Sequence, residues 1–503
     1  MQKKQPIGLF LILLIFPLLY FQVFTAKYFF SDDIHQLWYN KYSSASAASA
    51  SQGRWISGWV FDVSFGSIST VSQLRYLHIF SFISWILTTL LWFFIFTEWA
   101  NKLNLDKKFN SLTTVFIACC IPAAIYIGWT SCIQLFIGIC ASLLSGHFLF
   151  TSLFKERKLS AGTILLCTTT GIISLSTYQN TFGLFLLPFF IYYIQSQKSK
   201  PARTVITGIV SYCIIISLYF LIFRFYILIN EISQSERTRI STDLLGKLSF
   251  LFSDPLPMVF SVNFLYSSRS IFSQVLAPLV MAAWAISLFI RFKKNKIYNT
   301  IGRLLFVLLL LVLIYLPSMV ASENFASYRT LFALHLAVFY LLIDQLFFFI
   351  KEEKRKKYAM YSTCFFLVFT GFYNFNFQFV NPLKAEYEAF AVFMKKNMRI
   401  DRQTVYFIRA DKFMFSPYYH TLPYKDEFGL PSTNKDWVPE PLIKQSVFEL
   451  TGDRGKGEKI KILQFADTTE FNKANVQLSG NDLLIDINKI FSDYQKEKQH
   501  SEK

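Results

Sequence analysis

Long apolar runs recur along the first three quarters of the chain. A transmembrane helix needs about 20 consecutive, mainly apolar residues, and by this rule the pattern predicts about eleven spans. They centre on residues 7–26, 76–97, 110–128, 132–153, 159–177, 181–197, 204–229, 270–290, 304–322, 330–350 and 358–380. Stretches 109–154 and 159–197 contain no Asp, Glu, Lys or Arg, and each can hold two helices. The second stretch is short, so a re-entrant hairpin is the alternative there.

Basic residues between the apolar runs predict the orientation of the chain. Lys and Arg together number 50 against 32 Asp and Glu, a net charge of +18. They gather in short loops, which is typical of membrane topology rather than of a nucleic-acid surface. One side receives Lys3, Lys4, Lys102, Lys107, Lys108, Lys155, Arg157, Lys158, Lys198, Lys200, Arg203, Arg291, Lys293, Lys294, Lys296, Arg303, Lys351 and residues 354–357. The opposite side receives Lys27, Lys41, Arg54, Arg75, Arg237, Arg239, Lys247, Arg269 and Arg329.

This asymmetry favours eleven spans over ten or twelve, with the N-terminus in the cytoplasm and the C-terminal part outside. The first run, residues 7–26, is longer than the usual apolar core of a signal peptide and lacks an Ala-x-Ala cleavage site, so we expect a retained helix. Together these features predict a multi-pass protein of a bacterial inner membrane.

Composition agrees with this class. Hydrophobic residues make up 53% of the chain and charged residues 16%, against about 25% charged in soluble domains. The seven cysteines all fall inside apolar runs, where Cys behaves as a small hydrophobic residue. We therefore expect neither a disulfide framework nor a cysteine metal site. The fold class is predicted to be a polytopic α-helical membrane protein with one small soluble α/β domain.

Three segments fall on the predicted outer side: residues 27–75, 230–269 and 381–503. The first contains the Ser- and Ala-rich stretch Ser43–Ser51, which we expect to be a mobile loop. The third follows a transmembrane domain at residues 1–380 and alternates helical and strand patterns. Helices are predicted at Leu383–Met398 and Glu440–Leu450, and strands at Thr404–Ile408, Lys459–Phe465 and Asp482–Ile487.

The adjacent acids Asp32 and Asp33 lie just after the first apolar run. They could be solvated loop acids or the N-cap of a helix that begins at Ile34. The functional alternative is a general base, because an acid beside another acid in partly desolvated surroundings has one pKa raised toward useful base strength. Adjacent side chains in extended backbone point to opposite faces, so we expect only one of the two to reach a reacting atom.

Arginines on the outer side are candidate anion-binding groups. Arg54 and Trp55 could anchor a helix at the membrane interface, or could bind a phosphate and stack on a sugar ring. Arg329 could pair with Glu323 in the same short loop, or could neutralise a lipid phosphate. Arg224, near the outer end of an apolar run, is a weaker candidate, because a lone intramembrane Arg often only extends toward the interface.

Tyr178 and Gln179 lie at a predicted outer turn between two charge-free spans. They could form a simple polar turn. Their position also places hydrogen-bonding side chains at the same membrane boundary as the acid pair, where they could bind a substrate.

Four short motifs in this order carry a family resemblance. They are Ser31-Asp32-Asp33, Gly53-Arg54-Trp55, Ser176-Thr177-Tyr178-Gln179 and Tyr328-Arg329-Thr330-Leu331. Together they resemble the bacterial O-antigen-modifying glucosyltransferases, the serotype-converting enzymes often carried by temperate phages. The resemblance covers roughly residues 1–380 and implies a multi-span glycosyltransferase of the GT-C type.

The resemblance implies transfer of glucose from undecaprenyl-phosphate-glucose to a sugar of the lipopolysaccharide O-antigen on the periplasmic face. The partners would be this lipid donor, the O-antigen acceptor and membrane lipid, with no nucleic acid. Asp33 or Asp32 would deprotonate the acceptor hydroxyl, which inverts the anomeric carbon. Arg329, helped by Arg54, would stabilise the phosphate leaving group, and the Tyr178–Gln179 pair would bind sugar hydroxyls.

Two further points stay open on the sequence. The sequence indicates no particular cofactor, although a divalent cation could bind at Asp32 and Asp33. A lipid-linked sugar flippase or O-antigen transporter would also be polytopic and basic inside, and a receptor-like membrane protein would not need the acid pair. Charges along a central passage would favour a transporter, whereas charges gathered at one face favour an enzyme.

Overall fold

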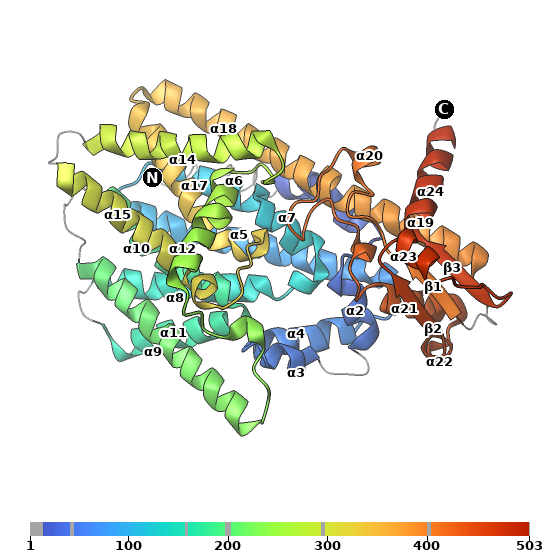
Figure 1. Ribbon diagram of the computed structural model, residues 1–503. Helices are drawn as coiled ribbons and strands as arrows, with labels where there is room; N and C mark the ends of the chain where they lie inside the picture. The colour runs from blue at the N-terminus through green and yellow to red at the C-terminus, as the bar shows by residue number, and fades with distance from the viewer. Residues whose placement is uncertain are drawn as a thin grey trace.

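The computed structural model describes residues 14–40, 45–155, 159–196, 203–292, 297–399 and 404–501. Up to residue 380, the described part of the chain consists of helices joined by loops (Figure 1). The elements are η1 (Phe21–Phe24), α2 (Asp32–Tyr39), α3 (Ala45–Ala50), α4 (Trp55–Gly66), η2 (Val71–Gln73), α5 (Leu74–Leu103), α6 (Lys107–Cys119), α7 (Ile121–Gly128), η3 (Thr130–Cys132), α8 (Leu135–Lys155), α9 (Ala161–Thr177), η4 (Gln179–Leu186), α10 (Leu187–Gln195), α11 (Arg203–Ile229), η5 (Glu236–Thr238), α12 (Leu244–Ser253), α13 (Pro255–Phe260), α14 (Ile271–Phe292), α15 (Ile297–Ile314), α16 (Leu316–Val320), η6 (Tyr328–Thr330), α17 (Phe332–Phe349), α18 (Glu353–Tyr373) and η7 (Asn374–Val380).

Five helices in the described ranges are long and apolar enough to cross a membrane. They are Val71–Leu103, Thr130–Phe154, Arg203–Ile229, Ile271–Arg291 and Phe332–Phe349. A sixth candidate is the pair α6 and α7, which is bent by 43°. Extended backbone at Cys120 and the proline at the start of α7 interrupt the helix there. The described part of the chain is therefore helical with five or six candidate membrane spans, all at positions that the apolar pattern predicts.

The other predicted spans fall on shorter or interrupted helices. Residues 159–177 and 304–322 correspond to shorter apolar helices, Ala161–Thr177 and Thr300–Ile314. The predicted span 181–197 is divided between η4 and α10, with Pro188 in the first turn of α10. The predicted span 358–380 ends in the π-helical segment η7. Of the predicted first span, residues 7–13 lie outside the described part of the chain.

The described part of the C-terminal quarter contains a small parallel sheet covered by helices. Its elements are α19 (Asn381–Asn397), β1 (Thr404–Ile408), α20 (Ser416–Tyr419), η8 (Ser432–Asn434), α21 (Pro439–Thr451), α22 (Arg454–Glu458), β2 (Lys461–Phe465), α23 (Thr468–Lys473), β3 (Asp482–Asp486) and α24 (Ile487–Ser501). The strand order is β2-β1-β3, and Thr404 pairs with Lys461 on one side and Asp482 on the other. Parallel strands need long crossovers, which the intervening helices supply. The strands lie where the sequence pattern predicts them.

The C-terminal elements gather at one end of the helical bundle, beside α2 (Figure 1). Polar contacts join them to the segment 27–75. The Gln445 amide donates to the Ser69 carbonyl at 2.7 Å, and the Val71 amide donates to the Glu449 carboxylate at 2.7 Å. The Arg454 guanidinium lies over the Trp38 ring, 4.1 Å from its centre. This part of the chain therefore packs directly on the first predicted outer segment.

The Ser- and Ala-rich stretch, expected to be a mobile loop, forms a helix in its described part. Residues Ala45–Ala50 make up α3, and residues 41–44 lie outside the described chain. Alanine has the highest helix propensity, so a Ser/Ala run needs little packing to become helical. The stretch packs beside α4, and its last turn reaches the cavity described next.

Candidate functional site

A cavity of about 320 Å³ lies where the predicted outer segments meet. Its charged lining residues are Asp32, Arg54, Arg237, Glu323 and Arg329. Polar lining residues include Gln36, Gln52, Ser131, Gln134, Tyr178, Gln179, Asn180 and Ser318. Distant parts of the chain thus supply one pocket, and it includes five of the residues that the sequence singled out besides Asp32: Arg54, Tyr178, Gln179, Glu323 and Arg329.

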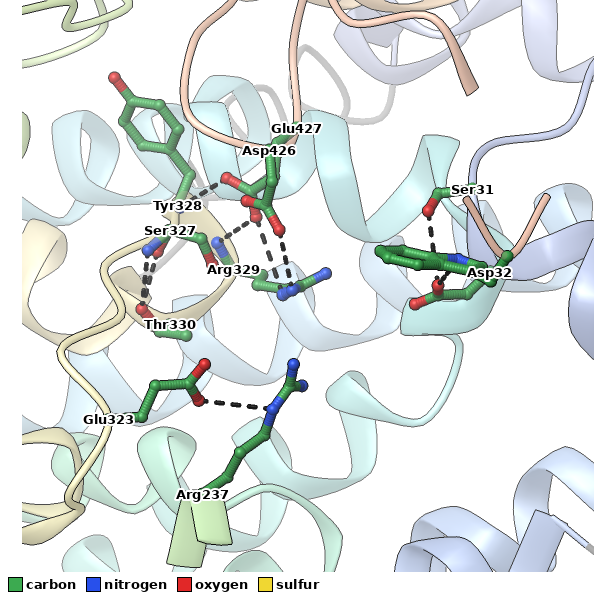
Figure 2. A network of polar contacts seen from close by, with 11 residues as sticks. Ser31, Asp32, Arg237, Glu323, Ser327, Tyr328, Arg329, Thr330, Asp426 and Glu427 are labelled. Carbon is green, nitrogen blue, oxygen red and sulfur yellow. Dashed lines mark hydrogen bonds and ion pairs between the residues drawn. The ribbon is translucent and has the colours of Figure 1, made fainter. Parts of the chain in front are cut away.

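Arg329 is the most strongly held cation of the cavity. Its side chain is 18% exposed and lies over the Trp129 ring, with 4.4 Å from the guanidinium carbon to the ring centre. A terminal nitrogen contacts Asp426 at 3.2 Å, and Nε lies 4.0 Å from Glu427 (Figure 2). A guanidinium stacked on an indole and bound to carboxylates keeps one orientation. Arg329 is therefore pre-positioned as a fixed positive charge.

Glu427 also holds the turn that carries Arg329. Its carboxylate accepts the backbone amide of Tyr328 at 2.6 Å and that of Arg329 at 3.1 Å (Figure 2). Burial and neighbouring Asp426 together raise the pKa of Glu427 to about 7, against the opposing effects of Arg329 and of the two backbone hydrogen bonds. Burial alone would lower the pKa of Arg329, but Asp426 and Glu427 raise it above its ordinary value, so the guanidinium stays charged.

Arg54 is held by a turn that requires glycine. Gly53 has a φ of +75°, and a Cβ there would lie 2.2 Å from the hydroxyl of Tyr219. That hydroxyl donates to the Gly53 carbonyl at 3.0 Å. The Arg54 Nε donates to Gln179 Oε1 at 2.9 Å, and its guanidinium carbon lies 4.4 Å from the centre of the Tyr178 ring. The two motifs therefore meet at one wall of the cavity.

Gln179 is satisfied by the protein itself. Its amide nitrogen donates to the Gln52 carbonyl at 2.8 Å and to the Tyr219 hydroxyl at 2.8 Å. Its oxygen accepts from Arg54. The side chain thus positions Arg54 and the turn at Gly53, while Tyr178 presents its ring to the same guanidinium.

Asp32 lies on the opposite wall, at the first residue of α2. The hydrogen bonds that it accepts from the described residues both reach Oδ1, from the Trp437 indole at 3.0 Å and from the Ser31 hydroxyl at 3.4 Å. The carboxylate is half-buried and faces the cavity across from Arg329 (Figure 2). Because both donors bind the same oxygen, Oδ2 keeps its lone pairs for a proton.

Asp33 points away from this cavity. Its side chain is 0% exposed, and its Oδ1 accepts both the amide and the hydroxyl of Ser131 at 2.8 Å. Its Oδ2 accepts the Phe30 amide at 3.0 Å. Burial raises the pKa of Asp33 to about 7, although these hydrogen bonds oppose the shift. Asp33 therefore ties α2 to the turn at Ser131. Both acids lie in the first turn of α2, with Ser31 as the N-cap, rather than in extended backbone before a helix that begins at Ile34. They occupy different surroundings because of the residues that pack around α2.

Replacing Asp33 by asparagine should change how stability depends on pH. The folded state raises the pKa of this carboxyl from 3.8 to about 7, so it binds a proton more tightly than the unfolded chain. Its contribution to stability therefore falls as the pH rises from about 4 to 7. In thermal melts of detergent-purified protein, the melting temperature of the wild type should fall further between pH 5 and pH 8 than that of Asp33→Asn.

The comparison with Asp33→Asn isolates this group, because the buried carboxyls of Glu386 and Glu427 also have pKa values raised to about 7 and act in the same direction in both proteins. The exposed Glu236→Gln variant is the matched control. Identical pH profiles for the wild type and Asp33→Asn would contradict the assignment of Asp33 as a buried, proton-binding residue.

Three other predicted residues have different surroundings. Glu323 contacts Arg237 at 3.6 Å rather than Arg329, so the anticipated pair within the 322–330 loop does not form (Figure 2). Trp55 does not line the cavity and packs against Tyr219, with ring centres 5.8 Å apart. Arg224 is exposed on α11 and lies outside the cavity lining.

The acid pair does not fit a bridging cation. Within the described ranges, no three or more His, Cys, Asp or Glu side chains are grouped to bind a metal. Hydrogen-bond donors occupy both oxygens of Asp33, which faces Ser131, while Asp32 faces the cavity. A dication bound by the two carboxylates would require Asp33 to give up these donors, so we derive no step through a metal.

Sequence reasoning missed several residues of the site. Arg237 lines the cavity, and Asp426, Glu427 and Trp437 come from the C-terminal segment. The Asp426-Glu427 pair lies beside Lys425 in a polar stretch, where acids are usually solvated. Their partner is about a hundred residues away, and no periodicity in the sequence reports such a contact.

No protein-family model matches the chain, and no curated protein matches it. The chemistry of the candidate site is therefore inferred from its own residues and geometry.

Proposed function

We propose that the protein is a membrane glycosyltransferase that moves a hexose, glucose by family resemblance, from undecaprenyl-phosphate-glucose to an O-antigen sugar. The observation that supports this most is the cavity itself: one half-buried carboxylate, Asp32, faces a wall with three arginines, Arg54, Arg237 and Arg329. Arginine suits phosphate because its planar guanidinium can donate two parallel hydrogen bonds. A carboxylate opposite bound phosphate is the arrangement that sugar transfer from a phosphate requires.

The cavity also has an apolar side that suits a lipid-linked donor. Ile216, Phe220 and Phe223 line it from α11, and Leu316, Pro317 and Phe325 line it from the segment around α16. Helix α11 is a candidate span whose outward residues, such as Leu221 and Phe225, are exposed. A polyprenyl chain could therefore leave the cavity along an apolar path while its phosphate stays among the arginines.

A side chain of the cavity is positioned to assist each bond change in the proposed reaction. Asp32 accepts the proton of the acceptor hydroxyl, whose oxygen bonds to the anomeric carbon as the carbon–oxygen bond to the phosphate breaks. The electron pair of that bond leaves with the polyprenyl phosphate. Arg329 and Arg54 stabilise its additional negative charge, and pre-positioned electrostatic stabilisation of this kind commonly contributes more to catalysis than any other effect. Attack from the side opposite the phosphate inverts the anomeric carbon.

The topology belongs to the same proposal. We place the chain in a bacterial inner membrane with eleven spans, the N-terminus in the cytoplasm and residues 381–503 as a periplasmic α/β domain. Most segments that line the cavity are loops or helix ends that charge asymmetry assigns to one side, and Ile216, Tyr219 and Phe220 line it from within α11. The cavity would then open to the periplasm, the side on which the family resemblance implies transfer. A flippase or transporter, the alternative, would instead need charged groups along its passage.

Expression in a bacterial host that supplies undecaprenyl-phosphate-glucose tests the proposal. We expect each O-antigen repeat to gain the mass of one hexose, measured by mass spectrometry of the released polysaccharide. Cells with the empty vector are the control. Unchanged O-antigen at normal membrane levels of the protein, in several hosts with different repeats, would reject the transferase. Reporter fusions that place residues 33 and 329 in different compartments would reject the shared outer vestibule.

A further inference from the structure

We propose that Trp437 is the platform on which the acceptor saccharide stacks beside Asp32. This inference rests on the proposed function and extends it, because it names a binding residue and its ligand class for the acceptor. Trp437 lies in the C-terminal segment, between η8 and α21, 405 residues from Asp32 in sequence. The structure alone brings the two together.

The geometry separates the two ends of the site. Arg329, on the arginine wall, is held by Asp426 at 3.2 Å. Asp32 lies across from it (Figure 2), and the Trp437 indole nitrogen donates to Asp32 Oδ1 at 3.0 Å. An inverting transfer needs the acceptor on the side of the anomeric carbon opposite the phosphate. The acceptor must therefore approach from the side of Asp32, where Trp437 stands.

Trp437 has the surface that a sugar ring uses. Its side chain is 43% exposed, unlike the buried indoles of Trp38 and Trp129. An exposed aromatic ring whose polar edge is already bound offers its face to the C–H side of a pyranose, while the neighbouring carboxylate accepts from hydroxyls. The hydrogen bond to Asp32 fixes the ring relative to the base, so a stacked sugar would be held with a hydroxyl near that carboxylate.

Neighbouring residues provide complementary polar contacts. The Lys435 ammonium lies 5.5 Å from the centre of the Trp437 ring and can donate to a sugar hydroxyl or an acidic sugar. Gln36 on α2 lines the cavity next to Asp32. Gln134 lines it as well, and its buried side-chain oxygen accepts no hydrogen bond within the described part of the protein. A polyhydroxylated ligand fits this lining better than an apolar one.

An exposed tryptophan can also anchor a protein at the membrane interface, and a matched control separates the two roles. Neither tryptophan is among the residues that line the cavity, but Trp437 borders it through its hydrogen bond to Asp32. Trp59 on α4 is 63% exposed and makes no such bond to Asp32 in the described structure. An interfacial role for Trp437 predicts equal losses of membrane-extracted protein in Trp437→Ala and Trp59→Ala, with unchanged saccharide binding. A platform role predicts a loss of saccharide binding in Trp437→Ala alone.

The test uses full-length protein in detergent and O-polysaccharide released by mild acid from the lipopolysaccharide of the expression host. Calorimetric titration without any lipid donor measures binding independently of catalysis. We expect Trp437→Ala to weaken binding roughly five- to tenfold, Trp59→Ala to match the wild type, and Trp437→Phe to keep most of the affinity because it keeps a ring face.

Transfer assays add the kinetic readout. We expect Trp437→Ala to raise the KM for the acceptor without raising the KM for the donor. Trp437→Phe, which removes the hydrogen bond to Asp32, should mainly change kcat. Equal polysaccharide affinity of Trp437→Ala and the wild type would overturn the platform, even if transfer is observed. Binding without transfer in the wild type would reject the proposed enzyme while leaving the saccharide site, and absence of binding in the wild type would overturn the platform.

Discussion

Asp32→Asn should reduce the rate of hexose transfer by about a hundredfold to ten-thousandfold, the usual contribution of a general base. Asparagine has nearly the same shape and can still accept the Trp437 hydrogen bond seen at Asp32 Oδ1. It cannot accept the proton that the attacking hydroxyl must lose. The effect should therefore appear in kcat, with little change in donor KM, when purified enzyme is assayed with radiolabelled lipid-linked glucose.

The matched control for this prediction is Glu236→Gln. Glu236 is another acid of the predicted outer side, its side chain is 87% exposed, and it pairs only with Arg239 at 3.6 Å within the described ranges. Exposed ion pairs of this kind contribute little to stability, so this variant should transfer at the wild-type rate. Wild-type activity of Asp32→Asn would eliminate Asp32 as the base and, with it, the proposed chemistry of the cavity.

Arg329→Gln should lower transfer by about a hundredfold to a thousandfold, the range seen when one pre-positioned charge-stabilising group is removed. The guanidinium is held over Trp129 and against Asp426, so its positive charge has a fixed position in the cavity. The amide of glutamine is neutral and cannot stabilise the charge of the leaving phosphate. Removing it also leaves Asp426 without its cation, which adds repulsion toward an anionic donor. The KM for the donor should rise, and kcat should fall.

Arg329→Lys refines this expectation. Lysine keeps the charge but loses the planar, bidentate geometry and the stacking surface, so only part of the activity should return. Arg269→Gln is the control, because Arg269 is an exposed arginine of the predicted outer side that does not line the cavity. Equal donor KM and kcat for Arg329→Gln and Arg269→Gln would show that Arg329 does not contact the phosphate. Normal thermal stability of Arg329→Gln would show that any loss is not a folding defect.

Arg329 illustrates what the sequence alone can and cannot predict about the site. The sequence marks it as a cation in an outer loop, together with Glu323 as its nearest acid. In the folded protein Glu323 pairs with Arg237, and Arg329 pairs with Asp426 and Glu427. Proximity along the chain suggests Glu323 as the partner of Arg329. The observed ion pairs differ because they depend on which side chains lie close together in the folded protein.

The acid pair shows the same division. In extended backbone, only one carboxylate of the pair could face a ligand. The structure instead places both acids in the first turn of α2, where Asp33 is buried on Ser131 and Asp32 lines the cavity. Which acid takes which role depends on the Ser131 turn and on Trp437, neither of which lies near the pair in sequence.

The sequence by itself determined the helical character, the positions of the long apolar helices and the strands of the C-terminal sheet, because each depends on local hydrophobic period and propensity. It also predicted which charged side chains fall in the predicted outer segments. Only the tertiary structure decided that Arg54 meets Gln179, that Asp426 and Glu427 hold Arg329, and that Trp437 reaches Asp32. These contacts join residues from about a hundred to about four hundred positions apart, and such distances are set by how helices and loops pack, which no local pattern encodes.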